Sequence, residues 1–124
     1  MFQTAIPILR VSSSLAAEEF YCKHLGFTVL SSWRATETMD EPRYLTLGRE
    51  GARLHVHSFP SGTVGAGAVY VFVDDIDLLY ADLLSRGLSI SGPPIQQAWG
   101  TREIVVRDAD HNVVTFGQKR EMSP

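Results

Sequence analysis

An internal repeat constrains the fold of this chain more than any other feature of its sequence. Residues 5–11 form a short apolar run, followed by three serines and an amphipathic segment that ends at Gly26. Residues 68–73 repeat the apolar run roughly 60 residues later, followed by Asp74, Asp75 and a second amphipathic segment. An apolar run, a polar cap and a helix-length segment predict a strand and then a helix in each half.

The spacing of apolar residues supports both helices. In each segment they recur three and four positions apart, which places them on one face of a helix. The first face comprises Ala17, Phe20, Tyr21 and Leu25, and the second comprises Ile76, Leu79, Tyr80, Leu83 and Leu84.

Further strands are predicted after each helix. In the first half we expect them at 27–34, 43–47 and 52–59, the last two joined by a turn at 48–51. In the second half we expect them near 88–91, at 101–107 and at 113–117, with Gly92, Pro93 and Pro94 interrupting the first of these. Residues 58–67 are rich in Gly and Pro and read as the linker between halves.

The predicted fold class is α+β, in a single domain over 1–124 built from two βαβββ modules at about 1–60 and 67–120. Neither module can bury both faces of a four-stranded sheet alone. We therefore expect each helix to cover one sheet face, while the other faces curl toward each other around a cavity.

Side-chain alternation predicts which residues line that cavity. Leu45, Leu47, Leu54 and Val56 should face a helix, as should Val114 and Phe116. The opposite face should hold Tyr44, Arg53, His55, His57, Ala68, Tyr70, Phe72, Val113 and Thr115. The alternative is that Tyr70 and Phe72 belong to the core and that the histidines face solvent on an open sheet.

Composition excludes several classes of function. The 124 residues carry a net charge of −3 and contain no run of Lys or Arg, so nucleic acid is not an expected partner. No apolar stretch reaches membrane-spanning length, so we expect no membrane partner. Cys22 is the single cysteine and is expected to be reduced and structural, in a cytoplasmic protein.

Several segments resemble the vicinal oxygen chelate superfamily, which includes glyoxalase I, extradiol dioxygenases and bleomycin-resistance proteins. The resemblance rests on AIPILRV, FYCKHLGF, VYVFVDDIDLLYADL and AWGTREIVVRDADHN. It covers nearly the whole chain. His111 stands where the last motif usually has glycine, so His111 is expected to tolerate a positive φ at some strain.

The resemblance also locates the metal positions of the enzymes. Carried onto this chain they are Ile6, His55, Ala68 and Thr115. A metal enzyme needs about three protein donors, and Ile6 and Ala68 have none. We therefore expect no metal, no cofactor and no catalytic residue. The alternative is a glyoxalase-like lyase or dioxygenase-related metalloenzyme with altered ligands, or an acid–base catalyst using His55 or His57.

The metal-free, bleomycin-resistance type is the closest resemblance. Such proteins are dimers that bind and sequester a drug, so the implied function is capture of an aromatic small molecule such as an antibiotic. The implied partner is a second copy of the chain, with Pro7 at a first strand that can be exchanged. Flat side chains suit a planar ligand. The candidate ligand-binding residues are Trp33, Tyr44, His55, His57, Tyr70, Phe72, Trp99 and Thr115.

Charges near the predicted groove do not indicate one ligand. Asp40, Glu41 and Glu50 lie in loops that could reach it and would suit a cationic drug, whereas Arg34, Arg43 and Arg53 put basic groups in the same region. A neutral or anionic aromatic ligand therefore stays open, as does a partner peptide bound in the groove by an accessory module.

Overall fold

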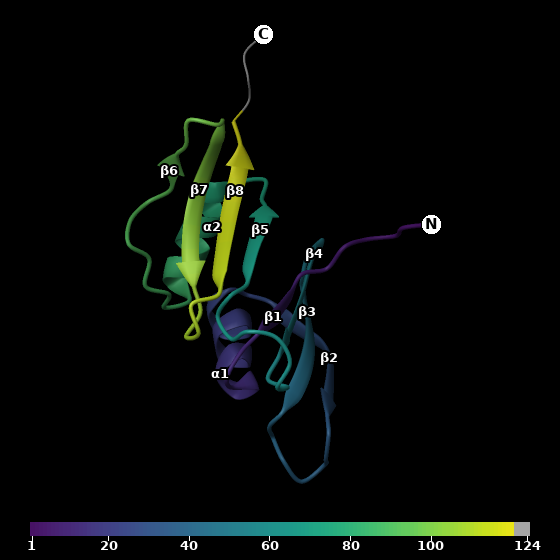
Figure 1. Ribbon diagram of the computed structural model, residues 1–124. Coiled ribbons are helices and arrows are strands. Elements are labelled where there is room, and N and C mark those ends of the chain that lie inside the picture. Colours follow the sequence, from purple (N-terminus) through teal and green to yellow (C-terminus); the bar gives the residue numbers. More distant parts are fainter. Residues whose placement is uncertain (121–124) are drawn as a thin grey trace.

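Two four-stranded sheets, each with one helical segment, make up the fold of the computed structural model, which describes residues 1–120 (Figure 1). The first sheet has the strand order β1-β4-β3-β2 and the second has the order β5-β8-β7-β6. In each sheet the two strands named first run parallel and the other neighbours run antiparallel. The predicted α+β class with two mixed sheets is confirmed.

The strands take up most of each half. Those of the first sheet are β1 (Ile8–Arg10), β2 (Thr28–Arg34), β3 (Arg43–Arg49) and β4 (Ala52–His57). Those of the second sheet are β5 (Ala68–Phe72), β6 (Ile95–Gln96), β7 (Thr101–Arg107) and β8 (Val113–Lys119).

Both helices begin at the caps that the sequence predicts. Ser13 Oγ accepts a hydrogen bond from the Ala16 amide at 3.1 Å, at the start of α1 (Ser14–Glu18). Asp75 caps α2 (Ile76–Ser85) in the same way. Such caps satisfy amides that lack a partner inside the helix. The first helix differs from the prediction in its second part, because α1 continues as the π-helical segment η1 (Glu19–His24).

The core lies between each helix and the sheet face that it covers. Leu45, Leu47, Leu54 and Val56 are at most 2% exposed, and Val114 and Phe116 are also buried. The helices contribute Tyr21, Leu25, Ile76 and Leu83 to the same core. The predicted alternation of buried and outward residues is therefore confirmed in both sheets.

One predicted strand was wrong. Residues 88–91 form no strand, and the short β6 lies beyond the Gly92-Pro93-Pro94 break, where Ile95 pairs with Glu103. Proline lacks the amide hydrogen that a sheet needs, so pairing with β7 starts only after the break. Leu88 and Ile90 instead pack half-buried against the core.

The first strand is shorter than predicted. It covers Ile8–Arg10 and pairs with β4 of the same chain, and the Pro7 carbonyl accepts a hydrogen bond from the His55 amide at 3.0 Å. The residues before it run away from the two sheets (Figure 1), and Phe2 is fully exposed.

Buried polar contacts join the two halves. Tyr21 Oη donates to Asp108 Oδ2 at 2.8 Å, in the turn between β7 and β8. Asn112 of the same turn is fully buried, donates to the Arg10 carbonyl and accepts from the Gly67 amide. Between Asp108 and Asn112, His111 adopts a φ of 68°, in the left-handed region that favours glycine. These contacts fix the two sheets relative to each other.

Candidate functional site

The outer face of the first sheet carries a row of four side chains, one from each strand. Arg10 pairs with His57, His57 with Tyr44, and Tyr44 with Trp33, so the row runs from β1 across β4 and β3 to β2. Because directly paired residues point to the same side of a sheet, these four side chains share the face opposite the helix.

A cavity of about 550 Å³ opens on this face and is lined mainly by aromatic rings. Tyr44 and His57 stack with ring centroids 5.5 Å apart and an interplanar angle of 11°. Trp33 stacks on Phe59 at the same centroid distance, with an angle of 26°. The full lining is Ile8, Trp33, Tyr44, His57, Phe59 and Ser61. Trp33, Tyr44 and His57 were predicted to line a cavity.

Phe59 was missed by the sequence analysis. It lies just beyond β4, at the end of the strand predicted over 52–59, and the alternation that places His55 and His57 outward, continued to Phe59, was the available signal. Its carbonyl accepts from Arg10 Nε at 2.8 Å, and the Gly62 carbonyl accepts from the same guanidinium at 2.9 Å. Arg10 thereby holds the loop that places Phe59 against Trp33.

The two histidines of β4 have different environments. His57 is 8% exposed, and its Nδ1 is buried without a hydrogen-bond partner in the described residues. Burial and the nearby Arg10 charge lower the pKa of His57, so the ring is neutral at pH 7. His55 is half-buried and its Nδ1 lies 2.8 Å from Tyr44 Oη. The alternative that both histidines face solvent on an open sheet therefore fails for His57.

The outer face of the second sheet carries a second aromatic group. Tyr70, Phe72 and Trp99 are 43%, 60% and 70% exposed, so the alternative that Tyr70 and Phe72 belong to the core is wrong. The rings of Tyr70 and Phe72 lie 4.9 Å apart. Thr115 pairs with Tyr70 across the neighbouring strand and shares this face.

A buried carboxylate lies among these rings. Glu103 is 7% exposed, and its Oε2 accepts hydrogen bonds from Tyr70 Oη at 2.7 Å, Thr101 Oγ1 at 2.7 Å and Trp99 Nε1 at 3.3 Å. Burial alone would raise the pKa of Glu103, but these hydrogen bonds outweigh it and hold the pKa below its ordinary value. Glu103 is therefore ionised at pH 7.

Glu103 was also missed as a site residue, although it stands in the motif that carries the resemblance. Alternation along β7 places it on the outer face with Thr101, which was the available signal. The hydrogen bonds from Tyr70 and Trp99 depend on the register between β5, β8 and β7, and no local pattern predicts them.

The predicted cavity between the outer faces of the two sheets is not formed within the described part of one chain, where the two aromatic groups lie on separate surfaces. The cavity on the first sheet is lined only by residues between Ile8 and Ser61. A second cavity of about 770 Å³ lies between the halves and touches Tyr70 and Phe72, together with Arg49, Asp82 and residues of β5 and α2, but it includes neither Trp33 nor Trp99.

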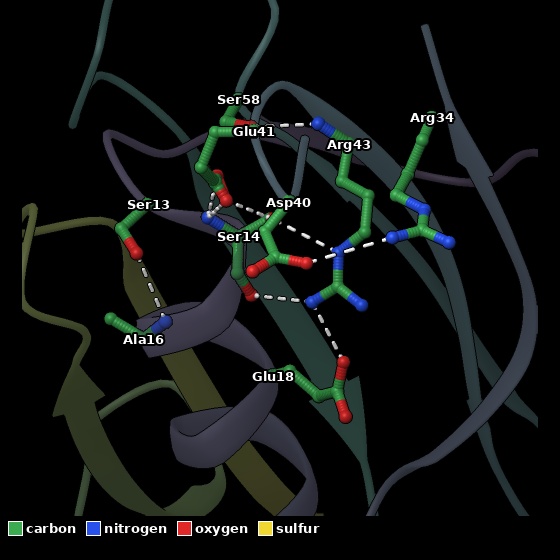
Figure 2. A network of polar contacts seen from close by, with 9 residues as sticks. All are labelled: Ser13, Ser14, Ala16, Glu18, Arg34, Asp40, Glu41, Arg43 and Ser58. Carbon is green, nitrogen blue, oxygen red and sulfur yellow. Dashed lines mark hydrogen bonds and ion pairs between the residues drawn. The ribbon is translucent and has the colours of Figure 1, made fainter. Parts of the chain in front are cut away.

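The acidic loop residues do not gather in the cavity beside Trp33, and Glu50 instead lines the second cavity, together with Asp82. Glu41, expected to reach the groove, instead accepts hydrogen bonds from the amide and hydroxyl of Ser14 (Figure 2). Arg43 donates to Ser14 Oγ at 3.0 Å and pairs with Glu18 at 2.8 Å. Asp40 lies 3.5 Å from Arg34, and these charges are therefore largely paired with one another (Figure 2).

The positions that correspond to metal ligands in the resembled enzymes offer few donors here. Ile6 and Ala68 have aliphatic side chains, Thr115 offers a hydroxyl, and His55 offers an imidazole that also contacts Tyr44. Within residues 1–120, no three His, Cys, Asp or Glu side chains are grouped so that they could hold a metal ion.

Comparison with known proteins identifies the family. The model of the Glyoxalase/Bleomycin resistance protein/Dioxygenase superfamily matches residues 3–116, and the chain belongs to this superfamily. No curated protein matches the chain. No helix in the described part of the chain is both long and apolar enough to cross a membrane.

Solved structures with the same fold include antibiotic-binding proteins. A bleomycin-binding protein complexed with bleomycin is 21% identical with a TM-score of 0.75, over 96% of this chain and 100% of that one. TnmS3, an antibiotic binding protein from Streptomyces sp. CB03234, is 26% identical with a TM-score of 0.70, over 96% and 98%. TioX from Micromonospora sp. ML1 is 21% identical with a TM-score of 0.76, over 95% and 99%.

Proposed function

We propose that this protein binds and sequesters a planar aromatic small molecule, such as an antibiotic, without metal chemistry. The observation that carries the proposal is the cavity of about 550 Å³ between Trp33, Tyr44, His57 and Phe59. Its size falls within the range of small-molecule sites, and its stacked rings offer flat apolar surfaces. Each ring stacked on a ligand adds about 0.5 to 1.5 kcal/mol beyond the burial of area.

The polar groups of the cavity suit binding better than catalysis. His57 is neutral and Nδ1 is enclosed, while the ring itself stacks on Tyr44. A structural neighbour was solved with bound bleomycin and another is described as antibiotic binding, which supports the same class of function for this chain.

We further propose that the working unit is a homodimer. In one chain the face bearing Trp33 and the face bearing Trp99 are separate and strongly exposed, at 62% and 70% for these two side chains. A second copy that laid its second sheet against the first sheet of its partner would bring both tryptophans to one groove and cover apolar surface. The first strand β1 pairs with β4 at the edge of the sheet in its own chain, and this edge pairing is the one that two copies would exchange. We place the binding in the cytoplasm, where the free thiol of Cys22 stays reduced.

Titration followed by tryptophan fluorescence tests binding. Bleomycin and an uncharged planar drug are titrated separately, and micromolar quenching by either supports capture of an aromatic ligand. The variant Trp33→Leu lacks the tryptophan of this cavity, so its affinity is measured by isothermal titration calorimetry, and it should bind at least about tenfold more weakly. Leu84→Ala, at an exposed position of α2 that lines neither cavity, is the control and should bind as the wild type does. No quenching by any planar aromatic compound would refute the proposal.

Two measurements test the remaining parts of the proposal. Sedimentation equilibrium should give twice the chain mass, and a monomer at binding concentrations would refute the dimer. Elemental analysis should find no stoichiometric transition metal, and drug binding should survive a chelator. A stoichiometric metal whose removal abolishes lyase or dioxygenase activity would instead support the alternative of a metalloenzyme with altered ligands.

A further inference from the structure

We infer that Glu103 is a specificity residue that selects aromatic ligands carrying a cationic nitrogen group, such as an amidinium or ammonium, beside the planar ring. The inference rests on the proposed function and names the chemical class of the ligand. It assigns a role to the outer face of the second sheet, which lies apart from the cavity beside Trp33.

The two carboxylate oxygens of Glu103 have different environments. Oε2 accepts all three hydrogen bonds, from Tyr70, Thr101 and Trp99. Oε1 has no hydrogen-bond partner in the described residues. It is not fully enclosed by protein atoms, so it can be reached from outside. The protein therefore orients the carboxylate through one oxygen and leaves the other open to the aromatic face.

The charge of Glu103 is not balanced by a cation within residues 1–120, where no ion pair includes it. Lys119 on the same face lies over the ring of Phe72, with Nζ 5.0 Å from the centroid. Arg102 points to the other face of the sheet and pairs with Asp77. A desolvated carboxylate held only by neutral donors attracts a cation more strongly than a solvated one.

The packing around Glu103 is specialised for this arrangement. Gly117 lies between Phe72 and Glu103 across the sheet, and its missing side chain leaves the space that Tyr70 crosses to reach the carboxylate. A Cβ at Gly117 would stand 2.6 Å from Tyr70 Cζ and closer still to Tyr70 Oη. The tyrosine and the carboxylate are thus fixed before any ligand arrives.

The exposed rings beside Glu103 complete a site for a cationic aromatic group. The two rings differ, because Lys119 lies over the exposed ring of Phe72, whereas Trp99 is 70% exposed and donates to the same carboxylate. A ring with an attached cation could stack on the Trp99 ring while the cation meets Oε1, which combines stacking, cation–π attraction and a charged hydrogen bond.

Two probes that share one ring system test the inference: the diamidine dye DAPI and phenylindole, its parent without amidines. On the wild-type protein DAPI should bind at least about tenfold more tightly than phenylindole, which corresponds to about 1.4 kcal/mol. The variant Glu103→Gln keeps the shape of the side chain and should lower the ratio of DAPI affinity to phenylindole affinity to within about twofold of one. Glu37→Gln, which removes the same charge from an exposed loop, is the matched control and should retain the preference.

The outcomes separate this inference from the proposed function. If phenylindole binds but DAPI binds no better to the wild-type protein, the role of Glu103 is refuted and aromatic capture stands. The same holds if Glu103→Gln folds, by circular dichroism, and keeps the preference. If Glu103→Gln does not fold, equal binding of the two probes to the wild-type protein would still refute the inference. If neither probe binds, both the inference and the capture of such ring systems fail.

Discussion

Substituting Gly117 by alanine should destabilise the protein through Tyr70. The new methyl group would occupy the space of the Tyr70 ring, 2.6 Å from Cζ, and would force the tyrosine away from Glu103. Losing a hydrogen bond to a charged group costs about 1.5 to 3 kcal/mol, and overpacking adds about 1 kcal/mol or more. Replacing glycine in an extended strand returns about 0.4 to 1 kcal/mol by restricting the unfolded chain. We expect a net loss of about 2 kcal/mol.

A double-mutant cycle isolates this mechanism. The atoms nearest to the added Cβ all belong to Tyr70, so in a Tyr70→Ala background the substitution at Gly117 should cost almost nothing. Urea unfolding followed by circular dichroism measures the free energies of unfolding of all four proteins. The urea midpoint of Gly117→Ala should lie about 1 M below that of the wild type. The coupling energy should be about 2 kcal/mol, well above the error of about 0.3 to 0.5 kcal/mol for independent sites.

The control for the cycle is Gly51→Ala in the turn between β3 and β4. A Cβ there meets no atom within 4 Å, so this variant should stay within about 0.5 kcal/mol of the wild type. Equal destabilisation by Gly117→Ala in both Tyr70 backgrounds would show that the clash with the tyrosine is not the cause.

Three further predictions concern stability. His111→Gly should stabilise the protein by about 1 kcal/mol in thermal unfolding, because glycine adopts the φ of 68° without strain; destabilisation would mean that the histidine side chain contributes. Tyr21→Phe should cost about 1 to 3 kcal/mol by leaving the buried Asp108 without this donor, and an unchanged urea midpoint would contradict it. Burial would raise the pKa of Glu41, but hydrogen bonds from Ser14 lower it overall. The stability that ionised Glu41 contributes is therefore fully present above the unfolded pKa of about 4.3 and is lost as the pH falls through the folded pKa. In Glu41→Gln the free energy of unfolding should fall less steeply between neutral and acidic pH, and an unchanged pH dependence would refute this.

The fold is predictable from the sequence because the signals for it are local or periodic. Helix caps at Ser13 and Asp75 act within one turn of the helix. Alternation along each strand separates inward aliphatic residues from outward aromatic ones, and burial confirms this separation. The break at Gly92-Pro93-Pro94 was predicted, but the strand was expected before it and lies after it. Which side of the break forms a strand depends on pairing with β7, and that pairing is not a local signal.

By itself, the sequence determined the two-sheet architecture and the kind of side chain on each outer face, since both follow from spacing along the chain. Only the tertiary structure decided which side chains meet. Strand register places Arg10, His57, Tyr44 and Trp33 in one row, and a loop adds Phe59 to them. Pairing across three strands also turns Glu103, one acidic residue among many in the sequence, into a buried carboxylate with three donors.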